Sequence, residues 1–233
     1  MNIESTNSWM AALNDYSYPV KLSCYEHANR FPNYFNTDIR GDRASTIDFE
    51  NYFRENAQRS IEVYFEVVFW KLYSQPNNRQ KGTDRIVNYM IREKIDSESV
   101  YNAVRHFVDV PSIRNLQIIR DLMGIKTDVL AVPLTFPAFL NPEKYPMVDN
   151  VVAKWVNANF TEHNRNRRAK LTPFALGYTS LRDNDFRNYL NWVGWCNEVS
   201  SVLTDKTGGR WRARDVEMAV FTARRNNFKL DVL

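Results

Sequence analysis

The sequence predicts an all-α protein, and three observations lead to this prediction. Apolar residues recur at helical spacing in most segments of the 233-residue chain. Candidate N-cap residues and Pro or Gly breaks separate these segments. We find no segment of strand length in which apolar and polar residues alternate between turn signals. The aromatic content of 14% and the seven glycines also exclude a disordered or low-complexity chain. The pattern indicates roughly eight to ten helices.

The first strong helical signal covers residues 47–74. Thr46 and Asp48 supply N-cap chemistry, and no Gly or Pro interrupts the run. Apolar side chains repeat from Ile61 to Leu72 and cover nearly all sides of the predicted helix. We therefore expect one long helix whose second half is the most buried element of the protein. Residues 1–45 have little periodicity and predict short helices and loops.

The later helices each begin at a residue that suits a helix N-terminus. The candidates, in chain order, are Thr83, Asp96 or Ser97, Pro111 or Ser112, Thr127 and Asp149. Pro133 and Pro137 should kink or shorten the helix after Thr127. Residues 159–170 are polar and basic and predict an exposed connection. Two final helices are expected at about 184–203 and 211–225.

Composition and charge narrow the classes of function. The net charge of +4 permits a polyanionic partner. Cys24 and Cys196 are too few for a disulfide framework or an iron–sulfur cluster, and the three histidines share no metal-binding spacing, so we expect no metal or cofactor. No Gly-rich phosphate loop occurs. Neither a signal peptide nor an apolar run of about 20 residues is present, so we expect a soluble, cytoplasmic monomer, nucleoid-associated in a prokaryote, without a membrane partner.

The most informative segment runs from Leu122 to Trp155. It predicts a helix, a tight turn with Gly124, a second helix, a Pro-bounded loop and then Asp149 at the start of another helix. This arrangement resembles the helix-hairpin-helix DNA glycosylase superfamily. The resemblance implies two helical lobes with a cleft between them, and a duplex DNA partner. We expect one compact unit over 1–233, with 46–158 as the lobe that carries the hairpin and 1–45 plus 159–233 as the second lobe.

The residues of the hairpin suit binding of a DNA phosphate. A turn between helices presents backbone N–H groups at the start of the second helix, which favour an anion. Gly124 permits the turn, Ile125 follows it, and Lys126 and Thr127 add a charge and a hydroxyl donor. The alternative is an ordinary αα-turn that ends its first helix with a glycine cap.

Asp149 is the candidate catalytic carboxylate. The resemblance implies that it stabilises positive charge on the sugar as the base leaves and activates the attacking water. The alternative is that it only caps the helix that follows. Met123 and Lys126 stand where the family has Pro and a second Gly, and Asp128 occupies the slot of the Schiff-base lysine. We therefore expect a monofunctional enzyme, in which Lys126 is a catalytic candidate only if the hairpin is reshaped.

A base-excision enzyme also needs a pocket for the extruded base and contacts to the DNA backbone. Glu66 and Trp70 are the pocket candidates, since a carboxylate on so apolar a helix is expected to be partly buried. For Glu66 the alternative is pairing with a basic residue, and for Trp70 a place in the core. Arg165, Arg167 and Arg168 are the phosphate candidates, and the alternative is a solvated surface or internal pairing.

The leading hypothesis is therefore a DNA glycosylase-like protein of base excision repair, which cleaves the N-glycosidic bond of a flipped, damaged or mispaired base. A non-catalytic DNA-binding module of the same fold is the second hypothesis, and a helical interaction protein is the third. The lesion is not specified by the sequence, because contacts scattered along the chain select the base.

Overall fold

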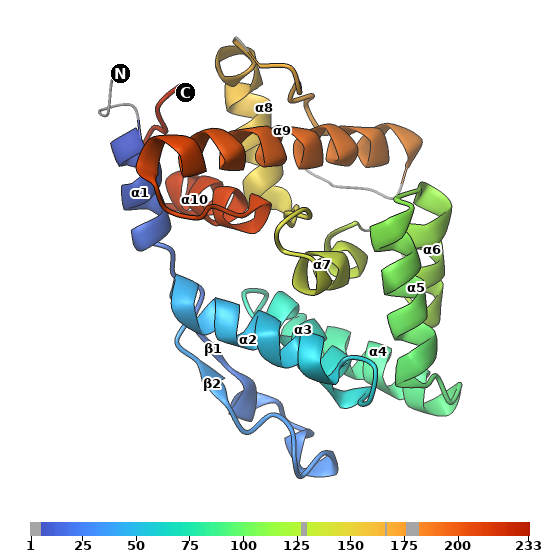
Figure 1. The fold of residues 1–233 in the computed structure, drawn as a ribbon. Coiled ribbons are helices and arrows are strands. Elements are labelled where there is room, and N and C mark those ends of the chain that lie inside the picture. The colour runs from blue at the N-terminus through green and yellow to red at the C-terminus, as the bar shows by residue number, and fades with distance from the viewer. Residues whose placement is uncertain (1–5, 127–129, 166, 176–181) are drawn as a thin grey trace. The chain divides into compact units, whose positions relative to one another are not determined.

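The computed structural model describes residues 6–126, 130–165, 167–175 and 182–233 (Figure 1). Within these ranges the chain forms ten α-helices and two strands of two residues each, so the all-α prediction is confirmed. The chain divides into two compact units. Unit 1 comprises Met1–Ser17, Val129–Leu134 and Asn141–Leu233, and unit 2 comprises Tyr18–Asp128 and Thr135–Leu140. These boundaries differ from those of the expected lobes.

Unit 2 contains five complete helices and the two strands. The strands β1 (Val20–Lys21) and β2 (Asp38–Ile39) are antiparallel, with Val20 opposite Ile39. Two residues are too few to produce an alternating pattern, which explains why the sequence does not predict them. The helices, in chain order, are α2 (Arg43–Asn56), α3 (Glu62–Leu72), α4 (Arg79–Arg92), α5 (Ser97–Asp109) and α6 (Ile113–Leu122).

The expected long helix over 47–74 is wrong, because the chain breaks between α2 and α3. The break contains neither Gly nor Pro, and hydrogen bonds from side chains, two of them to distant segments, accompany it. Ser60 Oγ bonds to Glu62 Oε2 at 2.7 Å and to the Tyr34 hydroxyl at 2.7 Å. Ser97 Oγ donates to the Gln58 carbonyl at 3.0 Å. These bonds to side chains hold the connection between α2 and α3, although the Ala57 and Ser60 amides still donate to the carbonyls four residues earlier.

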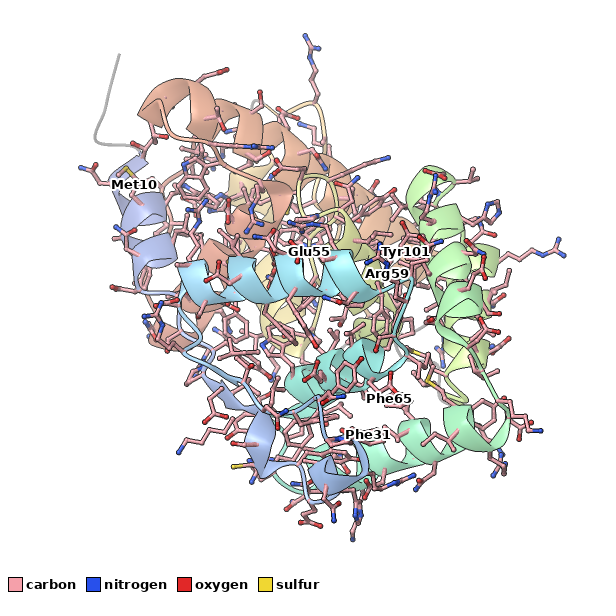
Figure 2. The ribbon with its side chains drawn as sticks, turned by 60° about the horizontal axis from the view of Figure 1, so that its bottom comes forward. Met10, Phe31, Glu55, Arg59, Phe65 and Tyr101 are labelled. Carbon is pink, nitrogen blue, oxygen red and sulfur yellow. The ribbon has the colours of Figure 1, made fainter. Side chains whose placement is uncertain are left out.

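α3 lies in the core of unit 2, as its apolar run predicts. Nine of its eleven residues are buried. Segments from the irregular N-terminal part of the unit pack on it. Phe31 lies against Phe65 with ring centroids 5.4 Å apart (Figure 2), and Phe35 lies 6.1 Å from Phe69.

Unit 1 is organised around α10 (Ala213–Asn226), which packs against α1 (Asn7–Asn14), α8 (Asn150–His163) and α9 (Asp183–Thr207). α7 (Ala131–Leu140) contributes residues to both units. α8 extends through residue 163, so the prediction of an exposed connection is wrong for residues 159–163. Among the helices in the described ranges, none is both long and apolar enough to cross a membrane.

Ion pairs allow α10 to be buried despite its charges. The Asp215 carboxylate accepts hydrogen bonds from the Arg212 amide at 3.0 Å and from the Arg212 guanidinium at 2.9 Å. Arg214 forms an ion pair with Glu217 one turn along the helix. Because the four side chains are at most 7% exposed, their charges must be compensated within the unit.

Candidate functional site

The turn after α6 is a glycine-capped helix end. The Gly124 amide donates to the Asp121 carbonyl at 3.0 Å, and the Ile125 amide donates to the Arg120 carbonyl at 3.2 Å. These two bonds, with Gly124 at φ +64°, form a Schellman motif. A Cβ on Gly124 would lie 2.3 Å from Cγ of Tyr89, so only glycine fits against this ring. Both the hairpin hypothesis and its glycine-cap alternative are consistent with this geometry.

The four hairpin candidates differ in what they offer to a ligand. The Gly124 and Ile125 amides are used within the turn, and the Ile125 side chain is buried. These two residues therefore shape the hairpin. The Lys126 side chain is exposed and can meet a phosphate. Thr127 lies outside the described residues.

Asp149 lies at the N-terminus of α8 and caps it. Its Oδ1 atom accepts hydrogen bonds from the Val151 amide at 2.9 Å and from the Val152 amide at 3.0 Å. The residue is half-buried, and its backbone is extended. Capping therefore fixes the carboxylate at the positive end of the helix dipole.

The segment before Asp149 is anchored to α9 by buried aromatic side chains. The Tyr189 hydroxyl donates to the Pro146 carbonyl at 3.1 Å. Trp192 Nε1 donates to the Met147 carbonyl at 2.9 Å. Both rings are fully buried, and burial raises the pKa of Tyr189 well above its usual value, so its hydroxyl remains a donor. The carboxylate thus sits at the end of a rigidly held loop.

The same loop is also held by the N-terminus of α10. The Ala213 amide donates to the Glu143 carbonyl and the Arg214 amide to the Pro142 carbonyl, each at 3.1 Å. Arg210 reaches the Glu143 carboxylate at 2.9 Å. The sequence does not reveal these anchors, because they join residues 43 to 72 positions apart. Asp149 belongs to unit 1, whereas Gly124, Ile125 and Lys126 belong to unit 2.

The basic cluster of Arg165, Arg167 and Arg168 contains both exposed and anchored arginines. Arg165 and Arg168 are exposed. The Arg167 side chain is only 7% exposed, because its guanidinium donates to the Leu233 carbonyl at 2.8 Å and lies 3.7 Å from the Glu198 carboxylate. Arg165 and Arg168 therefore remain the candidates for phosphate contacts, and Arg167 has a structural partner.

Glu66 lines a cavity of unit 2, and its assignment to a pocket for an extruded base stays a prediction. The residue is 3% exposed, and burial raises the pKa of its carboxyl group. Its partners are the Phe35 amide at 2.5 Å and the Tyr52 hydroxyl at 2.9 Å. The alternative of pairing with a basic residue is wrong, since none of the ion pairs among the described residues includes Glu66.

Trp70, the other pocket candidate, is placed differently from Glu66. It is 2% exposed and does not line the Glu66 cavity. Its ring lies among aromatic neighbours, 5.0 Å from Tyr18 and 5.2 Å from Phe139 between centroids. Trp70 is therefore a core residue of unit 2 that takes no part in this cavity, which agrees with the alternative of a place in the core.

Comparison of the chain with protein-family models, with curated proteins and with solved structures finds no match. Among the described residues, no group of three or more His, Cys, Asp or Glu side chains is placed to hold a metal ion. Cys196 is buried, and burial raises the pKa of its thiol well above the usual value, which disfavours the nucleophilic thiolate.

Proposed function

We propose that this protein is a monofunctional DNA N-glycosylase of the helix-hairpin-helix type, with Asp149 as its catalytic carboxylate. The observation that carries the proposal is the way Asp149 is held. Two amides of α8 orient its Oδ1 atom, and the loop before it is fastened to α9 and α10. A carboxylate that is fixed before the substrate arrives can stabilise a cationic transition state without reorganisation.

The chemistry assigned to Asp149 is hydrolysis at the C1′ carbon of a deoxyribose. The C1′–N bond breaks, and its electron pair leaves with the base. The positive charge that develops on the sugar is stabilised by the nearby carboxylate. A water oxygen then bonds to C1′, and the carboxylate accepts the proton that this water loses.

Lys126, Arg165 and Arg168 are the residues assigned to the DNA backbone. All three side chains are exposed and carry the charge that phosphates require. Gly124 and Ile125 support Lys126 by fixing the path of the turn. Contacts of this kind give affinity without reading sequence, as a repair enzyme that searches DNA requires.

The test is base release under single-turnover conditions from duplexes that carry uracil, 8-oxoguanine, hypoxanthine, an alkylated purine or a mismatch. The proposal expects release from at least one duplex. Salt-sensitive binding without any release would instead favour the non-catalytic DNA-binding module. Absence of both binding and release at low salt would favour the helical interaction protein.

A further inference from the structure

Unit 2 contains a cavity of about 510 Å³ that the chemistry proposed for Asp149 does not involve. It lies between the irregular segment that carries β1 and β2 and the helices α2 and α3. All residues that line it lie between positions 22 and 66. It is therefore a site within one unit, and its size suits a small organic molecule.

Glu66 supplies a buried carboxylate to this cavity without a cationic partner. Both of its hydrogen bonds come from neutral donors, the Phe35 amide and the Tyr52 hydroxyl. A buried carboxylate is ordinarily paired with a positive charge or neutralised, because burial of an unpaired charge is costly. In the described part of the chain, no Lys, Arg or His side chain forms an ion pair with Glu66.

The other charged groups of the wall are also mainly acidic. Asp38 and Asp48 line the cavity with Glu66, and Arg40 is the basic residue of the wall. Arg40 lies 3.7 Å from the Asp42 carboxylate and is largely exposed, so Asp42 already offsets its charge. The wall therefore favours a cation over an anion.

Three other residues of the wall are apolar and suit the body of an organic ligand. Leu22, Ile39 and Phe49 line the cavity, and each is less than a tenth exposed. An apolar body would gain by leaving water for this surface. A hydrated metal ion would gain nothing from it, and no group of three or more His, Cys, Asp or Glu side chains among the described residues is placed to hold one.

We propose that this cavity binds a small organic cation, a protonated amine or an amidinium group on a compact apolar or aromatic body. The charged group lies toward Glu66 and Asp48, and the body packs on Leu22, Ile39 and Phe49. This proposal does not depend on the chemistry assigned to Asp149, and either can fail without the other.

The test uses matched pairs of probes that share a shape and differ in charge. Benzamidine is compared with benzamide, and phenethylamine with 2-phenylethanol, by NMR titration of the full chain. The expected result is binding of at least one cation, with its neutral counterpart weaker by about tenfold or more. Equal binding within each pair, or no shift with either cation up to about 10 mM, would overturn the proposal.

Variants connect the binding to the acidic wall. Asp48→Asn removes an exposed charge of the wall, and Glu66→Gln removes the buried one. Each should weaken the cation about fivefold or more, while Asp205→Asn, the same change at an exposed position in unit 1, should leave it unchanged. If Glu66→Gln fails to fold, Asp48→Asn decides alone. Cation affinity that is unaffected by the wall variants would contradict the proposal.

Discussion

The Tyr52 hydroxyl of α2 donates a 2.9 Å hydrogen bond to Oε2 of Glu66 on α3, and both side chains line the same cavity. Burial is the main cause that raises the pKa of each group, and the Glu66 charge raises that of Tyr52 further. The Phe35 amide completes the arrangement at Oε1. This carboxyl group thus joins three segments of unit 2, at the cost of burying a charge.

Replacement of Glu66 by Gln should change how stability depends on pH. Because the folded-state pKa of Glu66 is raised above 4.5, the folded protein binds the proton more tightly than the unfolded chain. The stabilising contribution of the Glu66 carboxyl group is present below pH 4.5 and is lost as the pH rises through its folded-state pKa. The variant lacks this loss, so the free energy of unfolding relative to wild type should increase from acid to neutral pH. Urea unfolding across this range measures it, and parallel curves for the two proteins would contradict the account.

Glu66→Leu is the matched control for the hydrogen bonds. It removes the charge but leaves the buried Phe35 amide without its acceptor. We expect it to lower the free energy of unfolding by about 1–3 kcal/mol relative to Glu66→Gln. Equal stability of the two variants would show that the bonds contribute little.

His163 should produce a pH dependence of the opposite sign. Its ring lies 4.9 Å from Trp155 and 6.1 Å from Trp195, and burial lowers its pKa from 6.5 to about 4. Protonation is therefore disfavoured in the folded state, and stability is lost as the pH falls from 6.5 toward 4. The full effect is about 3 kcal/mol. His163→Phe should remove this part of the acid sensitivity in urea unfolding, and an unchanged profile would refute the assignment.

Gly124→Ala should destabilise the hairpin for two reasons. Its φ of +64° disfavours a side chain, and the new Cβ would overlap the Tyr89 ring. We expect a loss of about 2–4 kcal/mol in the free energy of unfolding. Gly208, at the end of α9, has a φ of +69°, and a Cβ added there would meet no atom within 4 Å. Gly208→Ala should therefore cost only about 1–2 kcal/mol. Equal losses would mean that the ring contact is unimportant.

The arginines of the basic cluster should separate by role. The double variant Arg165→Ala/Arg168→Ala should weaken DNA binding and reduce the slope of log affinity against log salt by about 1–2. Arg167→Ala should mainly lower stability, because its guanidinium is bonded to Leu233 and Glu198. Fluorescence anisotropy over a salt series, with thermal melts alongside, distinguishes these effects. A salt slope unchanged in the double variant would remove these arginines from the DNA interface.

Local chemistry predicts three of the later helix starts. Asp96, Ser112 and Asp149 cap α5, α6 and α8 as expected, because a cap depends on residues within one turn.

The predicted starts at Thr46 or Asp48 and at Thr83 are wrong, because α2 begins at Arg43 and α4 at Arg79. The break before α3 is not predicted, since one of the bonds at Ser60 comes from Tyr34, 26 residues away.

For the candidate site, the sequence identifies single residues but not their tertiary partners. Glu66 can be identified as a pocket residue because a carboxylate stands out on an apolar helix. Its partners, Phe35 and Tyr52, cannot be identified, since each comes from another segment. Likewise the motif from Leu122 to Trp155 identifies Asp149 as a candidate. Tyr189 and Trp192, which hold its loop, are brought there only by tertiary packing.

The most direct test of the glycosylase proposal separates capping by Asp149 from catalysis. Asn caps a helix about as well as Asp, so Asp149→Asn should keep the bonds to Val151 and Val152 and a stability within about 0.5 kcal/mol of wild type. Asp149→Ala should lose about 1 kcal/mol. The measurement is the single-turnover rate of base release by Asp149→Asn on the duplex that wild type cleaves. We predict a rate lower by about 100-fold or more at unchanged stability. Release at the wild-type rate would contradict the assignment of Asp149 as the catalytic carboxylate.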